Sequence, residues 1–163
     1  MTPSQVARTY IGKLEKPGNS GFQDTNFEME MKHFGEWMPG YSWCACFAQL
    51  CFHYAYPEKA AIIKKLFDPS TRKTFMNLKE AGYKVSQDPI LDSLVIWGDY
   101  ENGVLTWQGH AGVVSEVINS KTFKSIEGNT SGGGSRNGDR VFEHVRNTLI
   151  KPSGLNVLGF IVI

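Results

Sequence analysis

The first half of the chain carries apolar residues at helical spacing. Thr2 and Pro3 form a typical helix start, an N-cap followed by proline at the first helical position. Apolar side chains then recur every four residues, on one helical face, at Val6, Tyr10 and Leu14. We therefore predict a helix that ends at Pro17-Gly18. It should be followed by a long, irregular but ordered segment over residues 18–41, where the periodicity is weak.

A second helical pattern begins after Ser42. Apolar positions three or four residues apart predict one helix that is buried on most sides, at Cys44, Phe47, Ala48, Cys51, Phe52 and Ala55. Ser42 is expected to be its N-cap, which puts Cys44 in the first turn. A third helix is predicted after Pro57, with inward-facing Ile62, Ile63, Leu66 and Phe67. A fourth is predicted over residues 70–81, where Gly82 stops it.

The second half of the chain alternates between short β-branched or aromatic runs and turn residues, a pattern typical of strands. The runs are SLVIW, GVLTW, HAGVVSEVI, TFKSIEG, RVFEHV and VLGFIVI. Helices first and strands afterwards indicate an α+β fold, in which N-terminal helices pack on an antiparallel sheet. The Gly-rich stretch 131–139 is expected to be a flexible surface loop, and the chain length fits a single domain over 1–163.

Composition and charge argue against several classes of function. The net charge is +1 and the basic residues are spread along the chain, so we expect no nucleic-acid partner and no membrane-binding basic helix. No apolar run approaches the ~18 residues of a membrane span, so membrane insertion is not expected. The N-terminus lacks the apolar core of a signal peptide, so we expect synthesis in the cytoplasm without one. An odd count of three cysteines argues against a disulfide framework.

The cysteines all lie within residues 44–51 and admit several interpretations. On one helix Cys46 points about 200° away from Cys44, which disfavours a shared metal site. Cys44 and Cys51 share a face but would lie ~10.5 Å apart, beyond disulfide reach, and no CxxC redox pair exists. Cys46 and Cys51 are interpreted as core residues. Cys44 is either a third core cysteine or a nucleophile, since a helix start lowers a thiol pKa and can hold an oxyanion.

A nucleophilic thiol needs a base and a group that orients the base. His110 begins a predicted strand between glycines, where it would be exposed enough to meet a substrate; the alternative is a surface histidine at a strand end. Glu127 and Asn129 flank a glycine where the next strand enters a loop. Either could hold the imidazole in one tautomer, or the pair could simply form a turn. The order of thiol, histidine and then amide or carboxylate is that of papain-like enzymes.

The proposed chemistry also constrains the register of these two strands. In an antiparallel hairpin, an even sum of paired positions turns His110 away from Glu127 and Asn129, whereas an odd sum puts all three on one face. We predict the odd register, or a bulge that restores it. Glu127 or Asn129 should then lie beside His110, with the Cys44 sulfur on the other side of the ring. In that register one side of the hairpin should face the cysteine helix, namely Val114, Ile118 and Phe123.

The motifs together resemble one family. YSWCACF resembles the Trp-Cys-Ala-x-Phe signature of CHAP domains, the cysteine, histidine-dependent amidohydrolases/peptidases. GHAGVVSEV resembles their histidine strand, and SIEGNTS with the later GDRVFEHVR resembles their Glu-x-Asn strand, Gly-rich loop and basic strand. The resemblance implies a papain-like fold with Cys44 as nucleophile, His110 as base, Glu127 as third triad member and Asn129 as a polar helper. It also implies cleavage of amide bonds in bacterial peptidoglycan, between muramic acid and L-alanine or within the peptide.

Around this site we expect a groove that suits packing against sugar and peptide, with walls from Tyr41, Trp43, Trp107 and Gln108. Some CHAP domains bind calcium through an acidic loop upstream of the cysteine. Here the acidic residues of that region form no chelating pattern, so no metal or other cofactor is expected; they are Asp24, Glu28 and Glu30. Two alternative functions remain: an acyltransferase or deamidase toxin of the same fold, and a catalytically inactive wall-binding module.

Two biological settings fit such an enzyme without a signal peptide. One is a phage endolysin whose release depends on a holin. The other is an antibacterial effector delivered by a secretion machine, with an immunity protein protecting the producer. In both settings the chain would act on peptidoglycan in the periplasm or cell wall.

Overall fold

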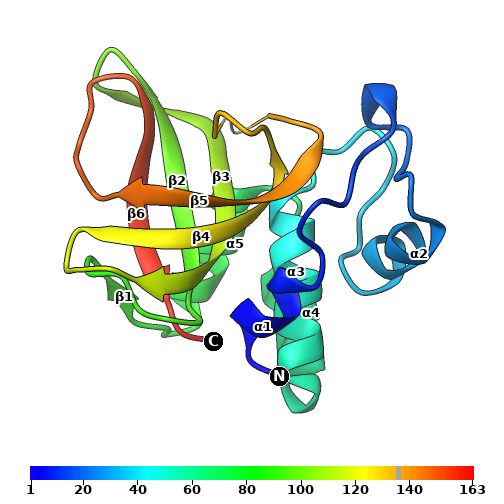
Figure 1. Cartoon of the computed structure of the whole chain (residues 1–163). Helices are drawn as coiled ribbons and strands as arrows, with labels where there is room; N and C mark the ends of the chain where they lie inside the picture. Colours follow the sequence, from blue (N-terminus) through cyan, green and yellow to red (C-terminus); the bar gives the residue numbers. More distant parts are fainter. Residues whose placement is uncertain (135–136) are drawn as a thin grey trace.

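The computed structural model describes residues 1–134 and 137–163. Helices come before strands along the chain (Figure 1). The helices are α1 (Pro3–Arg8), α2 (Thr25–His33), α3 (Cys44–Ala55), α4 (Ala60–Leu66) and α5 (Thr71–Glu80), with 3₁₀ turns η1 (Pro17–Asn19) and η2 (Pro57–Lys59). The predicted α+β fold, with N-terminal helices packed against an antiparallel sheet in the papain-like manner, is confirmed.

Within the described residues, six antiparallel strands form one sheet in the order β1-β6-β2-β3-β4-β5. They are β1 (Val85–Ser86), β2 (Leu94–Glu101), β3 (Val104–Val117), β4 (Thr122–Thr130), β5 (Arg140–Asn147) and β6 (Gly154–Ile161). Strands β2 to β5 are neighbours in chain order, and β6 returns to pair with β2. In Figure 1 the curled sheet occupies one side of the molecule, and α3 and α4 stand along the other side.

Helix α3 is central to the hydrophobic core. Its residues 44–52 are all buried, because α1 packs on one side of the helix and the strands β3 and β4 on another. Apolar side chains of α3 and of the facing side of the sheet form one cluster, which includes Phe47, Leu50, Val113 and Ile126. A smaller cluster covers the other face of the sheet, where successive side chains alternate; it contains Val95, Trp97, Val114, Phe123 and Phe160. The two faces of β3 and β4 are therefore both buried near the site.

The N-terminal helix is shorter than predicted. It begins as expected, with a capping box between Thr2 and Gln5, but it ends at Arg8. Gly12 then turns the chain at φ 89°, and its N–H donates to the Val141 carbonyl of β5 at 3.0 Å. This pairing with the sheet competes with helix continuation. Leu14 consequently forms a bridge to β5 and does not continue the helical face of α1.

Residues 18–41 were predicted to be irregular throughout. This was wrong, because the segment contains α2. Asp24 caps this helix by accepting a hydrogen bond from the Phe27 N–H at 2.9 Å. Phe27 and Met31, one turn apart, are the buried residues of α2. Two buried apolar positions are too few to give a recognisable helical periodicity in a segment that is otherwise mostly polar.

The strand pattern was predicted in outline, with one merger. GVLTW and HAGVVSEVI belong to a single strand, β3, which follows a tight turn at Asn102 and Gly103, both at positive φ. The short strand β1 was not predicted. The helix after Pro57 is present as α4, and the helix over residues 70–81 is present as α5. Of the predicted loop 131–139, residues 135–136 lie outside the described residues, and the others belong to no helix or strand.

The predicted bulge lies between β3 and β4. Near the hairpin turn the pairs have an even sum: Glu116 with Lys124, and Val117 with Phe123. Beyond a register shift at position 115 the sum is odd: Val114 pairs with Ser125, and Val113 with Ile126. The bulge thus restores the odd register toward His110, and this prediction is confirmed.

The side chains predicted to face the cysteine helix in that register do not do so, and this part of the prediction was wrong. Val114 and Phe123 belong to the cluster on the sheet face that does not contact α3, and Ile118 is exposed. The side chains that do meet α3 are those of Val113 and Ile126, a cross-strand pair on the opposite face of the sheet. The site and the core of α3 therefore use opposite faces of the same two strands.

Candidate active site

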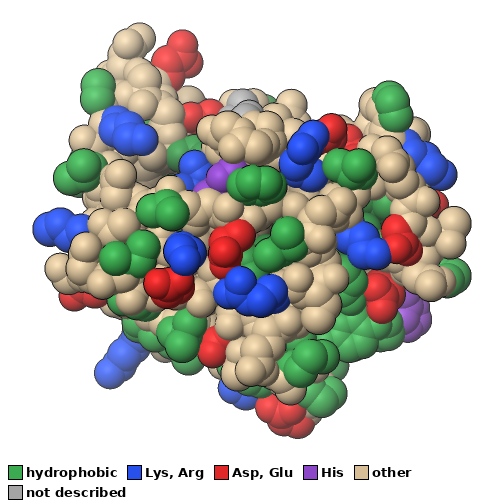
Figure 2. All heavy atoms as spheres, in the orientation of Figure 1, with side chains coloured by type: hydrophobic (Ala, Val, Ile, Leu, Met, Phe, Trp, Pro, Cys, Tyr) green, Lys and Arg blue, Asp and Glu red, His purple; other side chains and the backbone are tan. Residues whose placement is uncertain are grey.

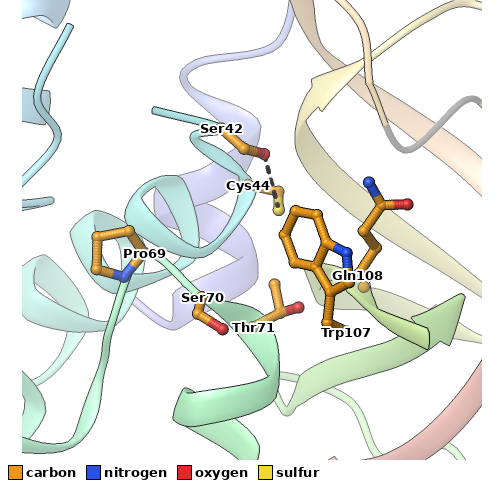
Figure 3. Close-up of a pocket in the computed structure, with 8 residues that line it drawn as sticks. Ser42, Cys44, Pro69, Ser70, Thr71, Trp107 and Gln108 are labelled. Carbon is orange, nitrogen blue, oxygen red and sulfur yellow. Dashed lines mark hydrogen bonds between the residues drawn. The ribbon is translucent and has the colours of Figure 1, made fainter. Parts of the chain in front are cut away.

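Cys44 is the first residue of α3, in the first turn as predicted, but Ser42 is not the N-cap. Trp43 occupies the cap position, and no side chain of the described residues caps this helix. The N–H groups of the first turn are left without a side-chain acceptor, at the positive end of the helix dipole. The Ser42 hydroxyl faces the thiol instead, with 4.0 Å between Oγ and the Cys44 Sγ (Figure 3).

His110 lies in the middle of β3 and is fully buried, which corrects the expectation of an exposed residue at a strand start. Its backbone pairs with Trp97 of β2, and the two ring centroids are 5.5 Å apart. The Nε2 atom lies 2.8 Å from Oε2 of Glu127. Because the carboxylate accepts from Nε2–H, Nδ1 is the nitrogen left to take a proton. Nδ1 is buried and makes no hydrogen bond of standard geometry in the described part of the chain, and the Cys44 thiol is the other group with which the ring interacts.

The carboxylate of Glu127 is fully buried and surrounded by donors. Besides His110, the Ser125 hydroxyl donates to it at 2.6 Å, and Arg146 donates through Nε at 2.8 Å and Nη2 at 2.5 Å. Gly112 gives this side chain its path across β3, because a Cβ there would lie 2.8 Å from Cγ of Glu127. The odd register and this glycine together bring Glu127 to His110.

Three pKa values are shifted at the site, each against the effect of burial. Burial alone would raise the pKa of Cys44, but His110, the Ala111 N–H and the Ser42 hydroxyl lower it. Burial alone would lower the pKa of His110, but Cys44 and Glu127 raise it to about 9. For Glu127, Arg146 and His110 outweigh burial and lower the pKa to about 2. The arrangement therefore favours a thiolate, an imidazolium and a carboxylate over the neutral forms.

Asn129 is connected to the thiol through Ser42. Its side chain is fully buried, and its Nδ2 donates to the Ser42 Oγ at 2.7 Å. Because this bond occupies an acceptor position of the hydroxyl, the Ser42 hydrogen is available to point at the Cys44 sulfur. Asn129 adopts φ 54°, a left-handed conformation that asparagine tolerates better than most residues.

A cleft opens over Cys44, between the start of α3, the start of α5 and the strand β3 (Figure 3). Trp107 and Gln108 line it, and the Trp107 side chain is 80% exposed. Tyr41 lines an adjoining hollow. Trp43 was expected in the groove wall, but it is fully buried in the core, where its ring packs edge-on against Phe22. Of the four expected groove residues, Trp107 and Gln108 therefore line the cleft, Tyr41 lines the adjoining hollow, and Trp43 lines neither.

The sequence interpretation missed the residues that support the site. Arg146 clamps Glu127, donates to the Gly134 carbonyl at 3.0 Å and lies over the Trp97 ring at 5.4 Å. Ser125 was missed as well. The alternation of side chains between the two faces of each strand could have identified them. Ser125 lies two positions before Glu127 and so shares its face of β4, and the register pairs Arg146 of β5 with Phe123 on that same face. Reading that signal requires the strand order, which the sequence pattern does not supply.

The remaining candidates have structural surroundings. Asp24, Glu28 and Glu30 are engaged as caps, ion pairs and acceptors: Asp24 with Lys13, Glu28 with Lys32, and Glu30 with the hydroxyls of Tyr10 and Tyr54. Among the described residues, no group of three or more His, Cys, Asp or Glu side chains could hold a metal ion. Cys46 and Cys51 are buried, and burial raises both thiol pKa values.

A comparison with protein families supports the resemblance seen in the motifs. A family model described as CHAP domain matches residues 36–129, more than half of the chain. The match begins before α3 and ends at Asn129, so it includes Cys44, His110, Glu127 and Asn129. No curated protein and no solved structure gave a significant match.

Proposed function

The chain belongs to the CHAP domain family, and on that premise we propose that it is a thiol-dependent enzyme that hydrolyses amide bonds of peptidoglycan. Members of this family are typically cysteine- and histidine-dependent amidohydrolases or peptidases acting on peptidoglycan. The finer assignment is an N-acetylmuramoyl-L-alanine amidase or a peptidoglycan endopeptidase. Either activity breaks one amide bond, so both need the same chemical groups.

The observation that carries the proposal is the set of charged groups next to an open cleft. Cys44 lines the cleft, its pKa is lowered mainly by His110 against the effect of burial, and His110 is bonded to Glu127 at 2.8 Å. A structural core cysteine would instead have a raised pKa, as Cys46 and Cys51 do. Perturbed pKa values at a cleft favour a catalytic role.

In the proposed mechanism the Cys44 thiolate attacks the carbonyl carbon of the amide. The carbonyl π electrons move to oxygen, and the N–H groups of the first turn of α3 stabilise the oxyanion. His110 then gives its proton to the leaving amine as the C–N bond breaks. Water attacks the acyl-enzyme with His110 as base, which releases the acid product and returns the thiol. Glu127 keeps the ring in one tautomer throughout and stabilises its charged form.

Asn129 contributes indirectly in this mechanism, as a positioning residue. It directs the Ser42 hydroxyl, and that hydroxyl donates toward the thiolate before attack. The 2.7 Å bond between Asn129 and Ser42, and the 4.0 Å separation of Ser42 from the sulfur, support this role. A hydrogen-bond donor near the thiolate stabilises the anion and so lowers the pKa of the thiol.

The proposal includes the setting in which the enzyme works. It would act in the periplasm or cell wall, either as a phage endolysin released through a holin or as a secreted antibacterial effector paired with an immunity protein. Expression of the chain alone, with and without export to the periplasm, separates an activity that needs access to the wall from a cytoplasmic toxicity. Lysis only on export supports action on peptidoglycan.

Digestion of purified cell walls tests the chemistry directly. We expect wild-type protein to release new amino groups, and Cys44→Ala and His110→Ala to reduce release by at least ~10³-fold. Asn129→Ala should retain partial activity. Cys46→Ser and Cys51→Ser are matched controls that should stay active with some loss of stability. Mass spectrometry of the products identifies the bond. Equal loss in all three cysteine variants, with folding intact, would contradict the single-nucleophile assignment.

A further inference from the structure

The cleft over Cys44 continues into a second hollow that the amide chemistry does not use. The two share Ser42, Pro69, Ser70 and Trp107 as walls. Away from the thiol the second hollow is bounded by Gly40, Tyr41, Asp68 and Lys73. We name this end, defined by those four residues, the far arm. Because the walls are shared, a substrate held at Cys44 can extend into it.

The far arm carries one side chain of each charge. Asp68 is fixed in place, because its Oδ1 accepts the Ser70 N–H at 2.8 Å. Lys73 is exposed on the first turn of α5. Neither residue forms an ion pair within the described residues, whereas Lys13, Lys32, Lys64 and Lys124 do. The far arm thus offers an ammonium and a carboxylate that no described residue pairs with in a salt bridge.

Aromatic side chains flank the route between the thiol and these charges. The Trp107 side chain is 80% exposed and Tyr41 is 46% exposed. In Figure 3 the Trp107 ring lies across the cleft from Pro69, with Ser70 and Thr71 between them. Rigid rings of this kind pack well against an alkyl chain. The hollow therefore combines an apolar passage with a dipolar end.

We propose that the far arm binds the free end of a diamino acid in the peptide stem, where one carbon bears both an ammonium and a carboxylate. Lys73 would bind the carboxylate and Asp68 the ammonium, while Trp107 and Tyr41 hold the alkyl chain. The assignment rests on the proposed function, since it names the substrate class for the same cleft. A lysine-type stem offers only the ammonium and leaves Lys73 unpaired. An amidated stem does the same.

The test compares three soluble muropeptides that differ at this end: one with free diaminopimelate, one with its carboxylate amidated, and one with lysine. For wild-type protein we expect a KM about tenfold lower for the free diaminopimelate peptide, because a charge-assisted hydrogen bond is worth about one factor of ten. Lys73→Met should raise KM for that peptide to the level of the other two, with kcat unchanged. Asp68→Asn keeps the acceptor for the Ser70 N–H and should raise KM for all three peptides.

Two variants remove the same charges outside the cleft. Lys84 and Asp88 are exposed and lie after α5. Lys84→Met and Asp88→Asn should leave the preference for the free diaminopimelate peptide unchanged. Equal KM values for the three peptides, or an equal rise for all three in Lys73→Met, would overturn the assignment. Calorimetric binding of the same peptides to Cys44→Ala measures the preference without turnover. Absent hydrolysis would then count against the proposed function, and absent preference in binding would count against the far arm.

Discussion

At the scale of single residues, one buried carboxylate balances two cations. Glu127 bonds to both His110 and Arg146, and these bonds hold its pKa at about 2 against the cost of burial. His110 in turn has a pKa of about 9, because Cys44 and Glu127 outweigh the effect of burial on the ring. Arg146 shares the carboxylate, so it limits how strongly Glu127 can hold the histidine proton. In the proposed mechanism the proton must leave His110, and this balance makes that possible.

Glu127→Gln tests the charge of this carboxylate while keeping an acceptor for His110. Without the negative charge, the pKa of His110 should fall from about 9 toward its ordinary value of 6.5. The imidazolium would then be lost at lower pH, so the alkaline limb of kcat/KM should move down by at least ~1 pH unit. The pH profile of wall hydrolysis measures this. Glu143→Gln, which removes a carboxylate that accepts from Ser115, is the control. An unmoved alkaline limb would refute the role of Glu127.

The same variant should change acid stability in a defined direction. A carboxyl group whose pKa is depressed on folding stabilises the protein above its unfolded pKa, 4.5 here, and loses that contribution as the pH falls through about 2. The shift corresponds to about 3 kcal/mol. Unfolding free energy should therefore decline less steeply below pH 4.5 in Glu127→Gln. For His110 the sign is opposite: its contribution is complete below 6.5 and is lost as the pH rises through about 9.

At the scale of elements, the site depends on how β3 and β4 are aligned. The bulge at position 115 changes the register so that Glu127 can reach across β3, and Gly112 leaves the space for it. One extra residue in one strand thus decides which face carries the carboxylate. The thiol comes from α3, on the helical side of the molecule, so the strands must present both groups to a helix start.

Gly112→Ala should damage the site more than the fold. The added Cβ would lie 2.8 Å from Cγ of Glu127 and 3.2 Å from the Ile126 carbonyl oxygen. We expect a loss of about 1–3 kcal/mol in unfolding free energy, as for other overpacked positions, and at least ~10-fold lower kcat because Glu127 is pushed off the ring. Gly132→Ala is the control, since no atom lies within 4 Å of a Cβ there. Wild-type kcat in Gly112→Ala would contradict this account.

The elements that could be predicted from the sequence are those with local signals. Helix α5 has a Ser70 cap and a Gly82 stop, and α3 has continuous apolar spacing, so both were found. Helix α1 was predicted too long because its end is set by pairing with Val141, a contact far away in the chain. The merger of two predicted strands into β3 has the same cause. Short gaps in a periodic pattern do not reveal whether pairing with a neighbour continues through them.

The residues with proposed chemical roles could be predicted from the sequence, but the residues that support them could not. Cys44, His110, Glu127 and Asn129 stand in short motifs, and the structure connects them to one cleft through direct or shared contacts. Arg146 lies on a strand that becomes a neighbour only through sheet order. Trp43 was wrongly predicted to line the groove: it is next to Cys44 in the motif, but its side chain points into the core. A position next to Cys44 in the sequence does not reveal whether a side chain at the helix cap points toward the cleft or toward the core.

At the scale of the whole molecule, the site lies at the junction of the helical layer and the sheet. α3 supplies the thiol and the strands supply the other groups, so their docking through one core cluster also aligns the chemistry. In Figure 2 charges of both signs are interspersed over the face shown, and the net charge is +1. Within the described residues, no helix is long and apolar enough to cross a membrane.

This organisation predicts that one of three thiols in the native molecule is reactive. The pKa of Cys44 is lowered, mainly because His110 outweighs burial, whereas burial raises the pKa values of Cys46 and Cys51. Iodoacetamide should modify Cys44 at least ~10-fold faster than the others and abolish wall hydrolysis in parallel, since the thiolate is the reactive form. Peptide mapping after timed alkylation measures the order. In urea all three should react at similar rates, which shows that the selectivity belongs to the fold. First modification at Cys46 would refute the single-thiol account.

EDTA should leave wall hydrolysis unchanged, because the proposed mechanism has no metal step. Inactivation by EDTA that calcium reverses would show that residues 18–41 hold an ion.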